Sequence, residues 1–346
     1  MSRIHLFAIL ILSSCSIVSA DVRSDIDDIA RVIEANYFDA QRGTAIAGDL
    51  RKAASSGEFD RHANRTELAK ELTQRLRKLD GHLGVRWQGD DAQTQASPRR
   101  RRSEPPEGRI NYGFKRIERL PGNLAYIELP YTAHIDFKDS RSAAKRAADA
   151  ALTLTRDADA VILDVRNNGG GSPTMVGYIV SAFVDAKANV YNTFHSRKGP
   201  VLSERPETPY DAPMTTVPLI VLVNGGTASA AESIAFTLQT AKRATVVGTR
   251  TAGAANPGAS FDTASGYSVF VATGAPRNPI NGRNWEGVGV KPDVEADDER
   301  ALVRAQEVAL EKVLSGALDG AQREDAQTAL EAIRSAAKGS SGKGQH

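Results

Sequence analysis

Residues 218–239 read "PLIVLVNGGTASAAESIAFTLQ". The first six residues form an apolar run that is typical of a buried strand. The run passes through the short loop "NGGTAS" into a segment with helical spacing of its apolar residues. A strand that leads through a glycine-containing loop into a helix is characteristic of an α/β core.

The same alternation continues on both sides of this stretch. "AVILDV" (160–165) predicts a strand, "TMVGYIVSAFV" (174–184) a helix, and "ATVVG" (244–248) a further strand. Strands that alternate with helices predict a largely parallel sheet, whose loops at the carboxyl ends of the strands carry the functional groups. Two loops fall there: "RNNGGGSP" (166–173) and "NGGTAS" (224–229). The fold class is therefore α/β.

The rest of the chain predicts several further segments. A basic start, an apolar run over 6–12 and the small-residue motif "VSA" ending at Ala20 resemble a secretory signal peptide. "LSSC", ending at Cys15, resembles a bacterial lipobox and leaves a lipid anchor as the alternative. The predicted organisation is a signal peptide (1–20), a helical N-terminal domain (21–88), a polar linker (89–108), a catalytic domain (109–297), a C-terminal helical tail (298–337) and a disordered end (338–346).

Composition narrows the range of functions. The formal net charge of +2 gives no general reason to expect nucleic acid binding, and the run Arg99–Arg102 lies in the predicted polar linker. No apolar run reaches the roughly 20 residues that a membrane span requires. Cys15 is the only cysteine, so cleavage after Ala20 leaves a chain without disulfides. We expect an exported protein, periplasmic or secreted, or one tethered through Cys15.

Two interpretations of Ser229 compete. Ser229 and Glu232 match a capping box, in which a serine opens a helix and a glutamate three residues later reaches back. Alternatively, Ser229 is a nucleophile beside an oxyanion hole, with one backbone N–H from Gly170 or Gly171 and another from Ala230. The glycines lack the spacing of a P-loop or a dinucleotide-binding motif. Asp164 and Arg166 are expected to pair and brace the glycine loop.

Four motifs in order carry a resemblance to a known family: "AVILDVRNNGGGSP", "PLIVLVNGGTASAAESIAFTLQ", "VVGTRTAGAANPG" and "NWEGVGVKPDV". Together they resemble the S41 peptidases, which include the C-terminal processing proteases, the tricorn core protease and interphotoreceptor retinoid-binding protein. The resemblance implies a ClpP/crotonase-like catalytic domain with ββα units, a peptide or protein substrate, and Ser229 as the nucleophile. It implies neither a metal nor another cofactor.

The resemblance also implies the general base. Processing proteases carry a lysine in the stretch where this chain has Ala254. The motifs are more similar to the tricorn and retinoid-binding branch, in which a histidine supported by a glutamate is the base. His82 in "DGHLGV" and Glu286 in "NWEGVGV" match these positions, whereas Gly81 stands where tricorn has a second serine. The segment between the helical and catalytic parts is too short for a PDZ domain.

Alternatives remain for each assignment. His134 and His195 are rival bases, His82 could cap a helix, and Glu286 could be a turn residue. A binding module without proteolysis is the main alternative function, because retinoid-binding relatives share the fold. An acyl-CoA enzyme would share the oxyanion hole, but export disfavours coenzyme A as a substrate.

Overall fold

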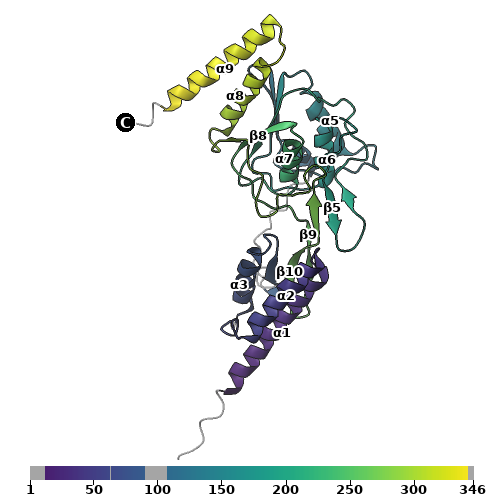
Figure 1. Ribbon diagram of the computed structural model, residues 1–346, viewed down its shortest axis with the longest axis vertical. Coiled ribbons are helices and arrows are strands. Elements are labelled where there is room, and N and C mark those ends of the chain that lie inside the picture. The colour runs from purple at the N-terminus through teal and green to yellow at the C-terminus, as the bar shows by residue number, and fades with distance from the viewer. Residues whose placement is uncertain (1–11, 63, 90–106, 342–346) are drawn as a thin grey trace, which may run out of the picture. The chain divides into compact units, whose positions relative to one another are not determined.

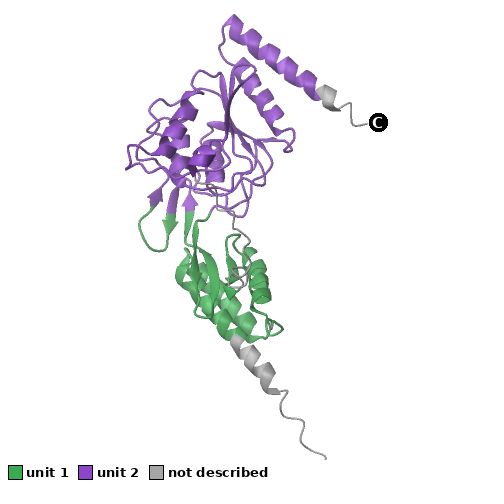
Figure 2. Cartoon of the chain, turned by 180° about the vertical axis from the view of Figure 1, so that it is seen from behind, with its two compact units in different colours: residues 1–101, 195–201, 256–275 green, residues 102–194, 202–255, 276–346 purple. Residues whose placement is uncertain are grey.

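The computed structural model describes residues 12–62, 64–89 and 107–341, with side chains from 22 onwards to 337. The chain divides into two compact units (Figure 2). Unit 1 comprises residues 1–101, 195–201 and 256–275, and unit 2 comprises 102–194, 202–255 and 276–346. This division differs from the predicted domains, because segment 256–275 belongs with the N-terminal helices.

Unit 1 packs three helices on a small antiparallel sheet. The helices are α1 (Leu12–Asn36), α2 (Ala40–Ser55) and α3 (Arg65–Arg77), and the sheet has the order β1 (Gly84–Trp87), β10 (Tyr267–Ala272), β9 (Gly258–Asp262). Val85 pairs with Val269 in the register of β1 and β10. The prediction of an all-helical domain over 21–88 was incomplete, because the strand that completes it lies about 180 residues away and local periodicity carries no information on such a pairing.

The helical periodicity predicted for the N-terminal part is confirmed. Ile26, Ile29 and Ile33 follow one face of α1, Tyr37 comes directly after the end of the helix, and all four are completely buried in the core of unit 1. Val269 and Val271 of β10 belong to the same core. Burial of a helix face against a sheet removes apolar area from water and is the main stabilising contribution of such a pair.

Unit 2 is built on a six-stranded sheet with the order β12-β8-β7-β4-β3-β2. Figure 1 labels strand β8 of this sheet and the α-helices of the same unit. Its strands are β2 (Arg116–Leu120), β3 (Leu124–Glu128), β4 (Ala160–Asp164), β7 (Leu219–Val223), β8 (Ala244–Gly248) and β12 (Val294–Glu295). All neighbouring strands are parallel except β2, which is antiparallel to β3. The predicted α/β class with a largely parallel sheet is confirmed.

Both faces of this sheet are buried, and alternate residues of each strand serve different cores. Val161, Leu163 and Val221 pack with α5 (Ala143–Thr153), α6 (Pro173–Ser181) and α7 (Ala230–Thr240). Ile162 and Ile220 pack on the opposite face with α8 (Ala301–Leu314) and α9 (Gly320–Ser341). Strands that are buried on both sides read as continuous apolar runs, which explains "AVILDV" and "PLIVLV".

The remaining elements are short. A 3₁₀ segment, η1, covers Glu107–Gly113, and a second three-stranded sheet has the order β11 (Gly274–Arg277), β5 (Thr193–Ser196), β6 (Leu202–Ser203). The predicted C-terminal helical tail corresponds to α8 and α9. Residues 338–341 of the end that was predicted to be disordered fall within α9, and the remainder of that end lies outside the described residues.

Several predicted features lie outside the described residues. They include most of the apolar run of the signal peptide, most of the polar linker and Arg99–Arg102. The two predicted processing points, Cys15 and Ala20, both fall within α1, and processing stays a prediction. Among the helices of the described ranges, none has the length and apolar character of a membrane span.

Candidate active site

Two loops of unit 2 lie side by side because β4 and β7 are adjacent parallel strands. The Asn224 side chain accepts the backbone N–H of Asn167 at 2.9 Å and donates to the Asn167 side chain at 3.0 Å. Farther along, the Ala228 N–H donates to the Asn168 carbonyl at 2.9 Å. The glycine loop and the segment that leads to Ser229 are therefore fixed to each other on the carboxyl side of the sheet.

Ser229 stands at the start of α7 in an unusual backbone conformation, with φ 54° and ψ −121°. Residues other than glycine rarely adopt this region, and holding one there costs on the order of 1–3 kcal/mol. The residue is exposed, although Ala230 and Ala231 after it are buried. Its hydroxyl lies near the Glu232 N–H but without the geometry of a hydrogen bond to the helix start. An exposed hydroxyl in a strained turn at a helix N-terminus suits a nucleophile.

Glu232 does more than cap the helix. Its side chain is completely buried, and one oxygen accepts the backbone N–H groups of Ser229 at 2.9 Å and Ala254 at 2.8 Å. The other oxygen accepts the Gly253 N–H at 2.7 Å and the Thr251 hydroxyl. One buried carboxylate therefore joins the serine turn to the 251–255 loop. The capping-box pattern predicted only the bond to Ser229.

The backbone N–H groups that were predicted as oxyanion donors differ in whether they already have a hydrogen-bond acceptor. The Gly170 N–H donates to the Asn168 side chain at 2.8 Å, and this bond removes Gly170 from the predicted donors. Among the described residues, the backbone N–H groups of Gly171 and Ala230 have no hydrogen-bond acceptor. A Cβ on Gly170 would lie 2.8 Å from the Ser229 Cβ, so the glycine loop reaches the serine directly. Of the three predicted donors, Gly171 and Ala230 are thus the ones that stay open.

Asp164 and Arg166 pair as expected. Arg166 Nη2 lies 2.6 Å from Asp164 Oδ2, and Nε donates to both carboxylate oxygens. Tyr126 also donates to Asp164 at 2.8 Å. Hydrogen bonding to Asp164 raises the pKa of Arg166 above its ordinary value. Arg166 further donates to the Asp298 carbonyl at 2.9 Å, so the first residue of the glycine loop is linked to the segment that precedes α8.

Glu286 lies on a loop that is fixed to the same part of unit 2. Its Oε2 accepts the Ala255 N–H at 2.8 Å, and the Gly287 N–H donates to the Gly253 carbonyl at 2.8 Å. The preceding Trp285 is 1% exposed and packs against Phe236 of α7, with ring centroids 5.1 Å apart. Glu232, the 251–255 loop and the Glu286 loop consequently form one hydrogen-bonded assembly.

His82 belongs to unit 1 and has a carboxylate beside it. The Asp80 side chain accepts the His82 N–H at 2.9 Å and the Tyr37 hydroxyl at 2.8 Å, and the His82 Nδ1 lies 3.6 Å from Asp80 Oδ1. Burial works to raise the pKa of Asp80, but bonds from His82 and Tyr37 outweigh it and lower the pKa to about 2. Helix α3 ends at Arg77, so His82 follows the helix and does not extend it.

Sequence reasoning did not identify Asp80, which is 4% exposed. The signal was its place two residues before the histidine, a spacing at which an aspartate accepts a backbone N–H in a tight turn. Since His82 lies in unit 1 and Ser229 and Glu286 lie in unit 2, the partnership of the three stays a prediction.

The two alternative bases, His134 and His195, have different surroundings from those of His82. His134 is exposed and its Nδ1 lies 3.1 Å from the Ser172 hydroxyl, next to the glycine loop of unit 2. His195 is an exposed residue of β5. The His134 Nδ1 lies within hydrogen-bonding distance of the Ser172 and Thr174 hydroxyls, whereas His82 lies beside the carboxylate of Asp80.

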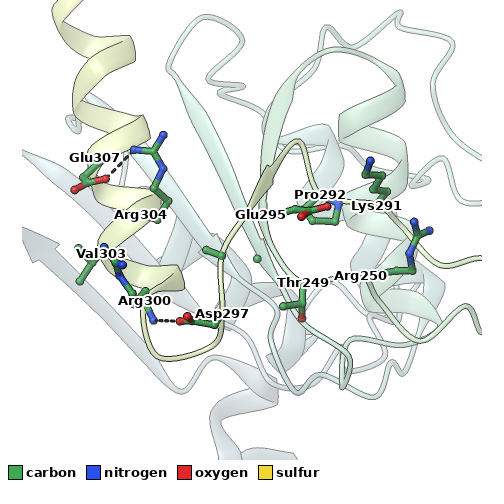
Figure 3. A pocket seen from close by; sticks show the side chains of 12 residues that line it. Thr249, Arg250, Lys291, Pro292, Glu295, Asp297, Arg300, Val303, Arg304 and Glu307 are labelled. Carbon is green, nitrogen blue, oxygen red and sulfur yellow. Dashed lines mark hydrogen bonds and ion pairs between the residues drawn. The ribbon is translucent and has the colours of Figure 1, made fainter. Parts of the chain in front are cut away.

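A cavity of about 660 Å³ opens elsewhere in unit 2, between the end of β8 and the start of α8 (Figure 3). Charges of both signs line it, and they include the ion pair of Arg304 with Glu307 at 2.7 Å. At the bottom of the view in Figure 3, the Asp297 side chain accepts the backbone N–H of Arg300 at 2.9 Å. Neither Ser229 nor the glycine loop contributes to its lining, so this cavity is distinct from the serine turn.

Comparison with known proteins agrees with this arrangement. The model of peptidase family S41 matches residues 123–296, which is half of the chain. A chloroplastic C-terminal processing peptidase of Tetradesmus obliquus is 33% identical over 187 residues, covering 52% of this chain and 38% of that protein. A carboxy-terminal-processing protease of Bartonella bacilliformis is 28% identical over 181 residues, covering 51% and 39%. The chain thus spans about two fifths of these relatives.

The fold has a counterpart among solved structures. A putative peptidase from Parabacteroides merdae superimposes with a TM-score of 0.60 at 21% identity, over 85% of this chain and 97% of that one. This likeness supports the fold, and the family model covers the glycine loop, the serine turn and the Glu286 loop alike. The chain belongs to peptidase family S41.

Proposed function

We propose that this protein is a serine-type endopeptidase that hydrolyses peptide bonds through an acyl-enzyme formed on Ser229. The observation that supports it most is the serine turn, where an exposed hydroxyl stands beside two open backbone donors, Gly171 and Ala230. Attack by the hydroxyl on a peptide carbonyl forms a tetrahedral intermediate, and two N–H groups aimed at its oxyanion stabilise it. Removal of one such donor typically costs about 10²–10³ in rate.

His82 is the proposed general base. A serine hydroxyl is a weak nucleophile at neutral pH, and imidazole titrates close to it. In this proposal His82 takes the proton of Ser229 and returns it to the leaving amine. The chain has Ala254 where processing proteases carry lysine, and this absence favours the histidine branch of the family.

Glu286 is the proposed orienting carboxylate, fixed by the Ala255 N–H. Asp80 holds the turn on which His82 stands. In this assignment Glu286 stabilises the protonated imidazole without exchanging protons itself, as the carboxylate of a catalytic triad does. The substrate is an unfolded protein or peptide.

Export is part of the same proposal. The first 20 residues have the pattern of a signal peptide, and Cys15 offers lipid attachment as the other route. Mass spectrometry of protein exported by a bacterial host tests this, and an N-terminus that retains Met1 excludes both routes.

Hydrolysis of an unfolded protein such as casein tests the enzymatic proposal. Wild type, Ser229→Ala, His82→Ala and His134→Ala are compared at equal concentration. Ser229→Ala and His82→Ala should lose activity by about three orders of magnitude or more, whereas His134→Ala should retain it. Loss of activity in His134→Ala but not in His82→Ala would identify His134 as the general base. A wild type that binds casein without hydrolysing it would favour a binding module.

A further inference from the structure

A buried polar cluster that catalysis does not use lies against the side of helix α7. It is centred on Glu204, which is 4% exposed, and the Ser233 hydroxyl of α7 lies 2.7 and 2.8 Å from its two carboxylate oxygens. The Asn192 amide nitrogen lies 2.9 Å from Glu204 Oε2 and also 2.9 Å from the Thr237 hydroxyl. Glu204 therefore contacts the nucleophile helix one turn after Ser229.

The cluster is held rigidly from its other sides. The Asn278 side chain, completely buried, donates to the Asn192 amide oxygen at 3.0 Å and so turns the Asn192 amino group toward Glu204. On helix α6, a Cβ on Gly177 would lie 1.8 Å from the Glu204 carbonyl oxygen, so the backbone of Glu204 rests directly on this helix. Glu204 has no room to move away from Ser233 without disturbing α6.

Within the described part of the chain, no Lys, Arg or His side chain forms an ion pair with this carboxyl group. Helix α6 contributes no charged residue, and the only one on α7, Glu232, directs its carboxylate to the 251–255 loop. The neighbouring Arg205 turns outward to the Ala186 and Ala188 carbonyls. Tyr178 of α6 bonds to Asp149 instead.

The hydrogen bonds that the cluster can form differ between the two protonation states of Glu204. If Glu204 is ionised, its carboxylate accepts from the Ser233 hydroxyl and from the Asn192 amide, and Asn192 divides its donors among Glu204, Ser233 and Thr237. No ion pair of the described residues balances the charge. A protonated carboxyl can donate to the Ser233 oxygen and still accept from Asn192. Burial accordingly raises the pKa of Glu204 to about 7, although Ser233 and Asn192 act to lower it.

We propose that Glu204 is a positioning residue whose neutral form holds the first turns of α7 through Ser233, and whose ionisation, by leaving a charge buried without a cation, favours local opening of the cluster to water, loosens α7 and slows attack by Ser229. An unpaired negative charge beside the start of α7 also opposes the positive potential that the helix N-terminus offers to an oxyanion. The part of the inference that concerns attack rests on the proposed function, whereas the part that concerns the helix does not.

The ionisation of Glu204 is tested first by the pH dependence of thermal stability. A group whose pKa is higher in the folded protein than in the unfolded chain binds protons preferentially on folding, so its stabilising effect falls as pH rises from about 4.5 to about 7. Thermal unfolding of the full chain is measured from pH 5 to 8.5 for wild type, Glu204→Gln and the exposed control Glu207→Gln. The melting temperature of wild type should fall relative to Glu204→Gln, and Glu207→Gln should follow wild type. Parallel curves for wild type and Glu204→Gln would overturn the proposal.

The hold on α7 is tested by amide hydrogen exchange. Exchange of the peptide that covers 230–240, corrected for intrinsic rates, should be faster in wild type at pH 8 than at pH 6 and equal at both in Glu204→Gln. If Glu204→Gln does not fold, Ser233→Ala replaces it as the test, since it removes the link and leaves the carboxyl group. That variant should lose the pH dependence of exchange, and retention of it would contradict the proposal.

The effect on Ser229 is tested by its rate of labelling with a fluorophosphonate. With a pKa of about 7, about a tenth of Glu204 is neutral at pH 8, so Glu204→Gln should label up to about tenfold faster than wild type there and about equally at pH 6. A merely structural role would slow Glu204→Gln by the same factor at every pH, which contradicts the inference. If Ser229 is not labelled in either protein, the proposed function fails, while unfolding and exchange still decide the role of Glu204.

Discussion

The buried carboxylate of Glu232 accepts the backbone N–H of Ser229 at 2.9 Å, three residues before it in the chain. The same side chain accepts the N–H groups of Gly253 and Ala254. A strained conformation at a functional residue persists only where the surroundings fix it, and Glu232 supplies that constraint for the serine turn. The capping role and the nucleophile role proposed for this turn are therefore compatible, since the glutamate caps and the serine hydroxyl stays exposed.

Replacement of Glu232 by glutamine should destabilise unit 2. Each carboxylate oxygen accepts from two donors, so an amide nitrogen in place of either oxygen leaves two buried donors without an acceptor. At about 1–3 kcal/mol for each of the two lost partners, we expect a loss of roughly 2–6 kcal/mol in the free energy of unfolding. Denaturant titration measures it, with Glu207→Gln as the exposed control, which should change stability by less than about 0.5 kcal/mol. A loss as small as that of the control would show that Glu232 does not fix the turn.

Glu286→Gln should leave the fold intact and lower kcat by about 10²–10⁴, because the change preserves shape and removes the charge that would stabilise a protonated histidine. The Ala255 N–H that bonds Glu286 still finds an acceptor in the amide oxygen. Steady-state kinetics together with circular dichroism measure both effects. Turnover within about twofold of wild type, or unfolding of the variant, would assign Glu286 to the turn alone.

Two neighbouring glycines offer a matched test of the glycine loop. Gly171 has φ +137°, and a Cβ there would lie 2.1 Å from the Thr132 carbonyl oxygen, whereas a Cβ on Gly169 meets nothing within 4 Å. Gly171→Ala should displace its N–H and reduce kcat by at least about 10², as loss of an oxyanion donor does. Gly169→Ala should remain close to wild type. Equal activity of the two variants would exclude Gly171 as a donor.

Asp80 should make unit 1 sensitive to acid. Its pKa of about 2 in the folded protein lies below the ordinary value of 3.8, so its stabilising effect is complete above about pH 4 and disappears as pH falls through about 2. The shift corresponds to roughly 2 kcal/mol. Acid titration of wild type and Asp80→Asn, followed by far-ultraviolet circular dichroism, measures it. A difference between the two proteins that does not change between pH 5 and pH 2 would contradict the assignment.

Much of unit 2 could be predicted from local sequence. Strands β4 and β7 are buried on both faces, so "AVILDV" and "PLIVLV" stand out as continuous apolar runs, and glycines mark the loops between them and the helices. The pairing of Asp164 with Arg166 could be predicted because the two residues are close in the chain.

Contacts between distant segments could not be predicted in this way. Strand β1 pairs with β10, and nothing in residues 84–87 indicates a partner at 267–270. The bond of Gly170 to Asn168 depends on how the loop folds back, which decides that Gly171 and not Gly170 is open. Glu232 and Glu204 resemble ordinary helix and loop glutamates in sequence, and only the packing around them shows that both are buried.

Covalent labelling at a single residue decides whether Ser229 is the nucleophile. Wild type and Ser229→Ala are incubated with a fluorophosphonate, the intact masses are measured, and the modified peptide is mapped. We expect one adduct on wild type, located at Ser229, and an unchanged mass for Ser229→Ala. An equal mass shift on both proteins, or no shift on a folded wild type, would contradict the assignment of Ser229 as the nucleophile.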